Sequence, residues 1–121
     1  MKKEISSRGD VELLVSAFYE KVLKDELLAP AFAGLDIQKH LPVMYGFWSS
    51  ILLDGYGYTG SPFDKHLRLD LSEAMFERWL LIFEKTVHEY FEGEKAEQAI
   101  QRARSIAWIF QSKLREMGKL G

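Results

Sequence analysis

The sequence predicts an all-α domain, and three observations lead to this prediction. Several long segments repeat apolar residues at steps of three and four, as the buried face of a helix requires. No segment shows the strict alternation of a half-buried strand. Most of the prolines and glycines fall between the periodic segments, where they separate one helix from the next. With 121 residues, 47% of them apolar, the chain has the size of one domain and enough apolar side chains for a core.

The composition also limits the classes of function. The net charge is −2 with both signs interspersed, which argues against nucleic-acid binding. There are no cysteines, so disulfides and thiolate metal sites are excluded. No apolar run approaches ~20 residues, and the N-terminus lacks the apolar core of a signal peptide. We therefore expect a cytoplasmic protein with no membrane partner.

The first helix is expected to follow a flexible lead-in over residues 1–9. Asp10 can cap this helix, and its apolar stripe includes Tyr19. Pro30 ends or bends it, and residues 30–34 form a short connector that carries one large apolar side chain, Phe32.

A second helix is expected to begin near Asp36 and to carry His40 on its apolar face. Pro42 complicates this helix, because a proline beyond the first turn clashes with the carbonyl group four residues back. Either regular helix begins near Leu41, or the helix is kinked at His40. In both cases His40 would lie on a loosely held, mobile turn.

The glycine-rich residues 54–71 separate this helix from the next, and His66 is expected on a short helical turn within them. Ser72 then marks the start of a helix with Trp79 on its apolar face, which Gly93 closes. The last helix, over residues 94–117, presents buried alanines that permit close helix packing. Residues 118–121 form a tail.

Outside these apolar faces, His88 falls on a charged face and is predicted to be solvated and non-functional. Trp108 lies off the apolar face of the last helix, and is interpreted as a surface residue or a dimer contact.

Tyr19, His40 and Trp79 share one property: each has a polar tip and lies on the apolar face of a different predicted helix. Taken singly, each is most often a core or partly exposed residue, and a lone loop histidine such as His66 is most often a cap. In so small a domain, however, these faces converge on one interior. A buried hydroxyl or indole N–H without a partner costs ~1–3 kcal/mol, and a gas ligand would supply that partner. A histidine facing three polar tips across an apolar pocket is what a haem site requires.

No competing chemistry has better support. The chain has no His-Glu-x-x-His zinc motif, no nucleophile elbow and no glycine-rich phosphate loop.

Four stretches of the chain resemble the truncated haemoglobins of group III. They are Phe18-Tyr19-Glu-Lys-Val22, Phe47-Trp48-Ser-Ser-Ile-Leu-Leu53, Tyr58-Thr-Gly60-x-Pro62 with His66-Leu67, and Phe76-Glu-Arg-Trp79-Leu80. The resemblance covers residues 10–117 and implies one truncated-globin domain, a two-over-two sandwich of α-helices around haem b.

By this resemblance, His66 matches the proximal iron ligand, Tyr19 the distal tyrosine, His40 the distal gate and Trp79 the pocket tryptophan. The haem wall is expected to include Phe18, Phe32, Met44 and Phe76. Cations are also needed at the pocket rim for the haem propionates, and Lys65, Arg68 and Arg78 are the candidates.

The implied function is reversible binding of dioxygen, carbon monoxide or nitric oxide with strong distal hydrogen bonds. Slow release would suit nitric oxide detoxification or peroxidase-like chemistry better than bulk transport. No flavin or nicotinamide motif is present, so turnover would need an external, unidentified reductase. The alternatives are a haem-based gas sensor or oxygen store, and a helical interaction module without a cofactor. The expected oligomeric state is a monomer or weak dimer.

Overall fold

The computed structural model describes residues 2–34, 36–53, 72–116 and 118, and these residues form helices and connecting segments. Over these ranges no strand is present, although an isolated bridge joins Lys3 to Phe91. The all-α prediction is therefore confirmed. The helices are α1 (Arg8–Lys24), α2 (Ala29–Phe32), α3 (Ile37–Leu52), α5 (Glu73–Tyr90) and α6 (Glu94–Glu116).

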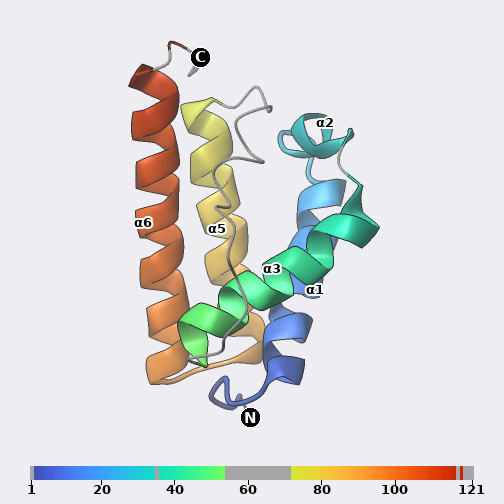
Figure 1. Cartoon of the computed structure of the whole chain (residues 1–121), viewed down its shortest axis with the longest axis vertical. Coiled ribbons are helices and arrows are strands. Elements are labelled where there is room, and N and C mark those ends of the chain that lie inside the picture. Colours follow the sequence, from blue (N-terminus) through green and yellow to red (C-terminus); the bar gives the residue numbers. More distant parts are fainter. Residues whose placement is uncertain (1, 35, 54–71, 117, 119–121) are drawn as a thin grey trace.

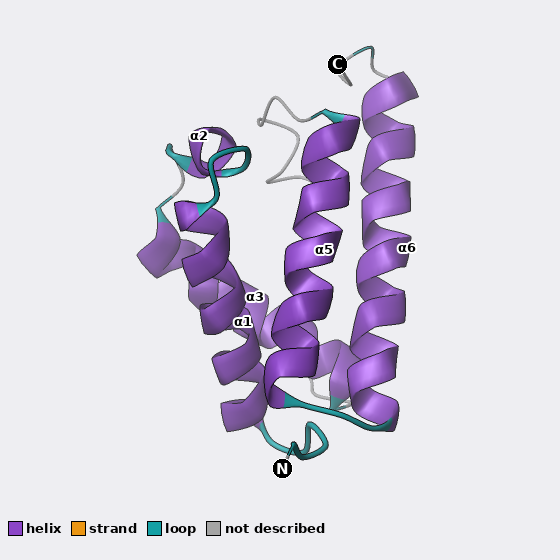
Figure 2. Cartoon of the chain, turned by 180° about the vertical axis from the view of Figure 1, so that it is seen from behind, coloured by secondary structure: helices purple, strands orange, loops and turns teal. Residues whose placement is uncertain are grey.

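The long helices form two pairs. In one pair α1 packs against α3, and in the other α5 lies side by side with α6, as both views show (Figures 1 and 2). The chain reverses between α5 and α6 at Gly93, whose φ of 101° is a conformation that favours glycine. The pairs are held together chiefly by contact between α1 and α5, with α3 reaching the first part of α6. The core therefore lies between two layers of two helices.

Helix α1 begins earlier than the sequence predicts. Its N-cap is Ser7, whose hydroxyl accepts a hydrogen bond from the Asp10 backbone N–H at 3.2 Å. The Asp10 carboxylate accepts in return from the Ser7 backbone N–H, also at 3.2 Å. This is a capping box, so Asp10 is the third residue of the helix and not its cap.

The N-terminal lead-in, predicted to be flexible over residues 1–9, ends at Ser7, and the structure places it in contact with the core. Ile5 is buried in the core, and Lys3 accepts a hydrogen bond at its backbone oxygen from Glu92. The Glu4 carboxylate accepts a hydrogen bond from the backbone N–H of Lys95, in the first turn of α6. The N-terminal segment is thus fixed to the α5–α6 turn, because one apolar side chain and two polar contacts anchor it.

Helix α3 runs through Pro42 without beginning again after it. Asp36 is its N-cap, and the backbone N–H groups of Lys39 and His40 both donate to the Asp36 carbonyl oxygen. The expectation that His40 lies on a loosely held turn is therefore wrong. His40 is a regular helical residue because capping by Asp36 fixes the first turn before Pro42 is reached. Its side chain is only 3% exposed.

In the second pair, the predicted close approach of α6 is present. Its alanines Ala96, Ala99, Ala103 and Ala107 are all buried. His88 is exposed, as predicted, and Trp108 is 70% exposed on the outer face of α6. Among the residues that the structure describes, no helix is long and apolar enough to cross a membrane.

Candidate functional site

A cavity lies between the two helix pairs. It encloses about 600 Å³ of empty space, part of which is open to solvent. Helices α1, α2, α3, α5 and α6 all contribute side chains to it. The lining residues are Phe18, Tyr19, Leu28, Phe32, Met44, Phe47, Trp48, Met75, Phe76, Trp79, Ile106, Ala107 and Phe110.

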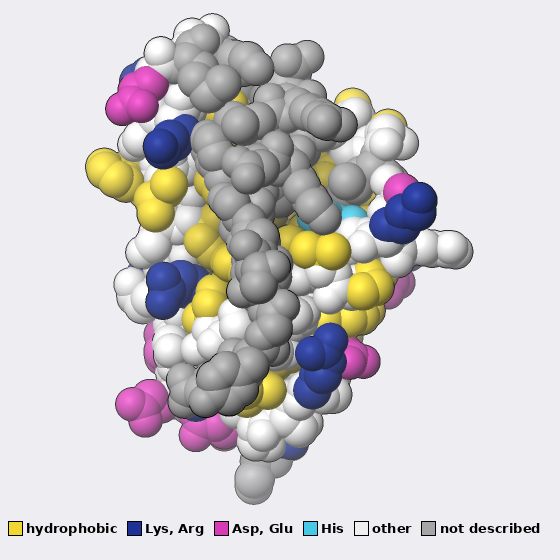
Figure 3. Space-filling model, viewed as in Figure 1, with side chains coloured by type: hydrophobic (Ala, Val, Ile, Leu, Met, Phe, Trp, Pro, Cys, Tyr) yellow, Lys and Arg dark blue, Asp and Glu magenta, His cyan; other side chains and the backbone are white. Residues whose placement is uncertain are grey.

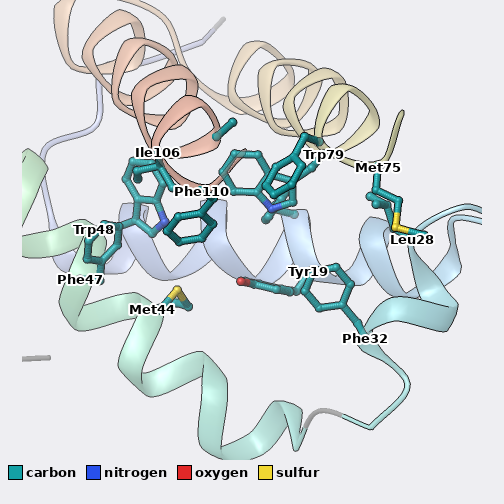
Figure 4. Close-up of a pocket in the computed structure, with 13 residues that line it drawn as sticks. Tyr19, Leu28, Phe32, Met44, Phe47, Trp48, Met75, Trp79, Ile106 and Phe110 are labelled. Carbon is teal, nitrogen blue, oxygen red and sulfur yellow. The ribbon is translucent and has the colours of Figure 1, made fainter. Parts of the chain in front are cut away.

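The lining is apolar and largely aromatic. Figure 4 shows Tyr19 from α1 and Trp79 from α5 extending into the same space, with Met44 on the α3 side and Phe110 on the α6 side. Apolar side chains are also visible on the molecular face shown in Figure 3, with charged side chains mostly toward its edges. A flat, apolar ligand is the class of molecule that such a lining favours.

Tyr19 and His40 form a buried hydrogen bond. The Tyr19 Oη lies 2.7 Å from the His40 Nε2, and both side chains are under 5% exposed. The two rings meet edge to face at 85°, with centroids 5.0 Å apart. Burial raises the pKa of the Tyr19 hydroxyl well above its ordinary value, so this group stays protonated at physiological pH.

The sequence predicts that Tyr19 and His40 face one interior, and the structure brings them into direct contact. His40 is not one of the residues that line the cavity. Its link to the cavity is the hydrogen bond to the hydroxyl of Tyr19, which does line it. Its side chain is therefore turned inward in this structure.

Trp79 is half-buried and belongs to an aromatic cluster. Its ring stacks on Phe83, with an interplanar angle of 15° and centroids 5.9 Å apart. Phe83 also stacks on Trp48, at 23° and 5.0 Å. Phe18 meets both Trp79 and Phe83 edge to face, at 85° and 80°. The cluster thus joins α1, α3 and α5, and three of its four rings line the cavity: those of Phe18, Trp48 and Trp79.

All four residues expected in the haem wall line this cavity: Phe18, Phe32, Met44 and Phe76. Sequence reasoning missed further lining residues, chiefly Leu28, Trp48, Met75, Ile106 and Phe110. Trp48, Met75 and Phe110 lie on periodic apolar faces, so periodicity signalled their burial. It could not signal which buried residues border a cavity, because that depends on how the helices cross.

Three of the predicted site residues, His66, Lys65 and Arg68, lie outside the described residues. Arg78 is described: its side chain is half-exposed, and its guanidinium lies 3.7 Å from the carboxylate of Asp25. In the described part of the chain, no three His, Cys, Asp or Glu side chains cluster in a way that could hold a metal ion.

Known proteins show the same sequence pattern and fold. The family model of the bacterial-like globins matches residues 3–111. The group 3 truncated hemoglobin ctb of Campylobacter jejuni is 34% identical over 98% of both chains. A group 1 truncated hemoglobin of Nostoc commune is 32% identical over 60% of this chain and 63% of its own. The crystal structure of a group III truncated hemoglobin from Campylobacter jejuni matches with a TM-score of 0.84 and 35% identity, covering 94% of this chain and 95% of that one.

The two helix pairs, the cavity between them and these matches together define a globin. The chain belongs to the bacterial-like globin family, and within it to the truncated haemoglobins of group III. The predicted two-over-two truncated-globin fold is therefore confirmed. Membership of this family supports haem-based binding of a diatomic gas by this chain.

The described residues fit a haem group. Ten of the thirteen lining side chains have no nitrogen or oxygen, as the apolar faces of a porphyrin require. The three exceptions, Tyr19, Trp48 and Trp79, each carry one polar atom at the tip of an aromatic ring. The Tyr19 hydroxyl, supported by buried His40, gives this apolar site a polar group that a gas ligand could contact.

Proposed function

We propose that this globin binds haem b with His66 as the iron ligand, and retains dioxygen or nitric oxide for chemistry. The observation that carries the proposal is the Tyr19–His40 hydrogen bond at the edge of an apolar cavity. Bound haem would supply a ferrous iron on which a diatomic gas is held and becomes partly negative.

The first step is to keep a proton available at Tyr19. Burial keeps the hydroxyl protonated, so it can act as a donor across the physiological pH range. When His40 carries its own proton on Nε2, that nitrogen donates to the Tyr19 oxygen. The hydroxyl proton is then free to point into the cavity, and His40 acts as a positioning residue for Tyr19.

Trp79 provides the second donor. Its indole N–H is a donor only, and it lines the same cavity as Tyr19. Donors already in place stabilise a partly negative ligand with little reorganisation. If each hydrogen bond to that ligand contributes ~1.5–3 kcal/mol, its loss speeds ligand release roughly 10- to 100-fold.

Two such donors favour slow release, which argues against bulk oxygen transport and for nitric oxide detoxification or peroxidase-like chemistry. Such turnover needs electrons, and we propose that a separate reductase supplies them. Four residues would contact the haem faces, namely Phe18, Phe32, Met44 and Phe76, and Lys65, Arg68 and Arg78 remain the predicted propionate contacts. Cytoplasmic location and a monomeric or weakly dimeric state also remain predictions.

The test is a visible absorption spectrum of the purified protein in ferric, dithionite-reduced and carbon monoxide-bound forms. An intense Soret band that shifts on reduction, and again with carbon monoxide, would support a histidine-ligated haem with an accessible sixth position. If no band appears even after hemin is added, the cavity is only core packing and the proposal is wrong. Turnover of nitric oxide with a supplied reductant would then distinguish an enzyme from a gas sensor or store.

A further inference from the structure

The orientation of the Trp79 indole depends on packing, and its ring contacts are the directional part of that packing. Among the described residues no acceptor receives a hydrogen bond from the Trp79 indole N–H, so no such bond fixes the ring. The χ2 torsion of tryptophan has broad and shallow minima, so the side chain alone does not fix the plane of its indole. Among the described residues, the indole has ring contacts with Phe18 and Phe83, and these contacts constrain its plane.

These two rings constrain Trp79 in different ways. Phe18 meets the indole edge to face and itself lines the cavity, so its removal would change both the cavity wall and the tryptophan. Phe83 lies nearly parallel to the indole, at 15°, and does not line the cavity. It is fully buried, one helical turn after Trp79 on α5, and its ring also stacks on Trp48 of α3. The stacked Trp48 ring on α3 therefore fixes the plane of the Phe83 ring.

We propose that Phe83 is a positioning residue for gas binding: its ring, fixed by Trp48, holds the Trp79 indole in the plane in which it lines the cavity. This inference rests on the proposed function, in which Trp79 donates a hydrogen bond to the bound gas. Phe83 contributes only through Trp79, so its effect on gas binding requires the indole to be present.

The test compares Phe83→Leu with Phe91→Leu. Both remove a phenylalanine that is at most 1% exposed in the same core cluster, but the described ring contact of Phe91 is with Tyr90 and not with a tryptophan. Phe83→Met is a second variant that preserves more of the volume without a rigid plane, in case the leucine variant folds poorly. Each protein is loaded with haem, and two quantities are measured: the rate of oxygen release and the C–O stretching band of the carbon monoxide complex.

We expect Phe83→Leu and Phe83→Met to speed oxygen release about 3- to 10-fold and to shift or broaden the C–O band, since a mobile indole donates a weaker hydrogen bond. Phe91→Leu should change the release rate less than about twofold. In a Trp79→Phe background, Phe83→Leu should have no further effect on either quantity. In the haem-free protein, Phe83→Leu should also weaken the near-ultraviolet circular dichroism of the indoles, because an indole gives a strong signal only when its plane is fixed.

The inference is overturned if Trp79→Phe changes both quantities while the two Phe83 variants match the wild type. It is also overturned if Phe83→Leu acts equally strongly in the Trp79→Phe background. A Trp79→Phe variant that itself leaves oxygen release and the C–O band unchanged would instead refute the proposed donor role of Trp79, and with it the basis of this inference.

Discussion

Replacing Tyr19 with phenylalanine removes one hydroxyl from the centre of the site and has two separable effects. In the haem-free protein, the buried 2.7 Å hydrogen bond to His40 is lost. A buried polar group that loses such a partner costs ~1–3 kcal/mol, so the free energy of unfolding should fall by about this amount. In the haem-loaded protein, loss of the donor should speed oxygen release roughly 10- to 100-fold.

Tyr45→Phe is a matched control. The Tyr45 hydroxyl lies 2.6 Å from the Ser16 Oγ, so this variant also removes a hydrogen bond between α1 and α3, but one outside the cavity lining. Urea denaturation measures the stability of both variants, and stopped-flow displacement of oxygen by carbon monoxide measures release. An unchanged release rate in Tyr19→Phe, or an equal acceleration in Tyr45→Phe, would refute the role assigned to Tyr19. A loss of stability with unchanged release would mean that the hydroxyl serves His40 alone.

Three further predictions concern the iron ligand, the capping box and the α5–α6 turn. His66→Ala should abolish stable haem binding in a hemin titration, whereas His88→Ala, which changes an exposed side chain, should leave the spectrum unchanged. Burial would raise the pKa of the Asp10 carboxyl, but hydrogen bonds to the carboxylate outweigh this effect and lower the pKa. The carboxylate therefore stabilises the fold above about pH 4, and this stabilisation is lost as the pH falls. Asp10→Asn should lower the free energy of unfolding by about 1–2 kcal/mol at pH 7, and urea denaturation should show the difference from the wild type shrinking below about pH 4. Gly93→Ala should destabilise by about 1–2 kcal/mol, because φ is positive there and the new Cβ would lie 3.1 Å from the Glu4 carboxylate; a melting temperature equal to that of the wild type would contradict this.

The long helices could be predicted from periodicity because each buries one continuous face. Their ends were harder to predict, since they depend on capping. The Ser7 hydroxyl competes with Asp10 for the role of cap, and only the reciprocal bonds decide between them. The four-residue helix α2 was missed as well, because one turn is too short to show a period.

The members of the site could be predicted in part, but their mutual contacts could not. That Tyr19 and Trp79 border one cavity follows from converging apolar faces. The hydrogen bond between Tyr19 and His40 depends on the crossing of α1 over α3, which no local pattern specifies. Leu28 is fully buried although it lies beyond the periodic part of α1, because α2 folds back and closes the cavity beside it.

The attachment of the N-terminal segment has a consequence for the order in which the chain acquires its structure. Glu4 and Lys95 are 91 residues apart, so this contact is among the most non-local in the protein. Contacts of such separation form late, because the entropy of closing the intervening loop must first be offset by other interactions. During synthesis, the first residues leave the ribosome long before their partners on α6 exist. The Glu4 contact therefore waits until most of the chain has been made, and it then joins the N-terminal segment to the last helical pair.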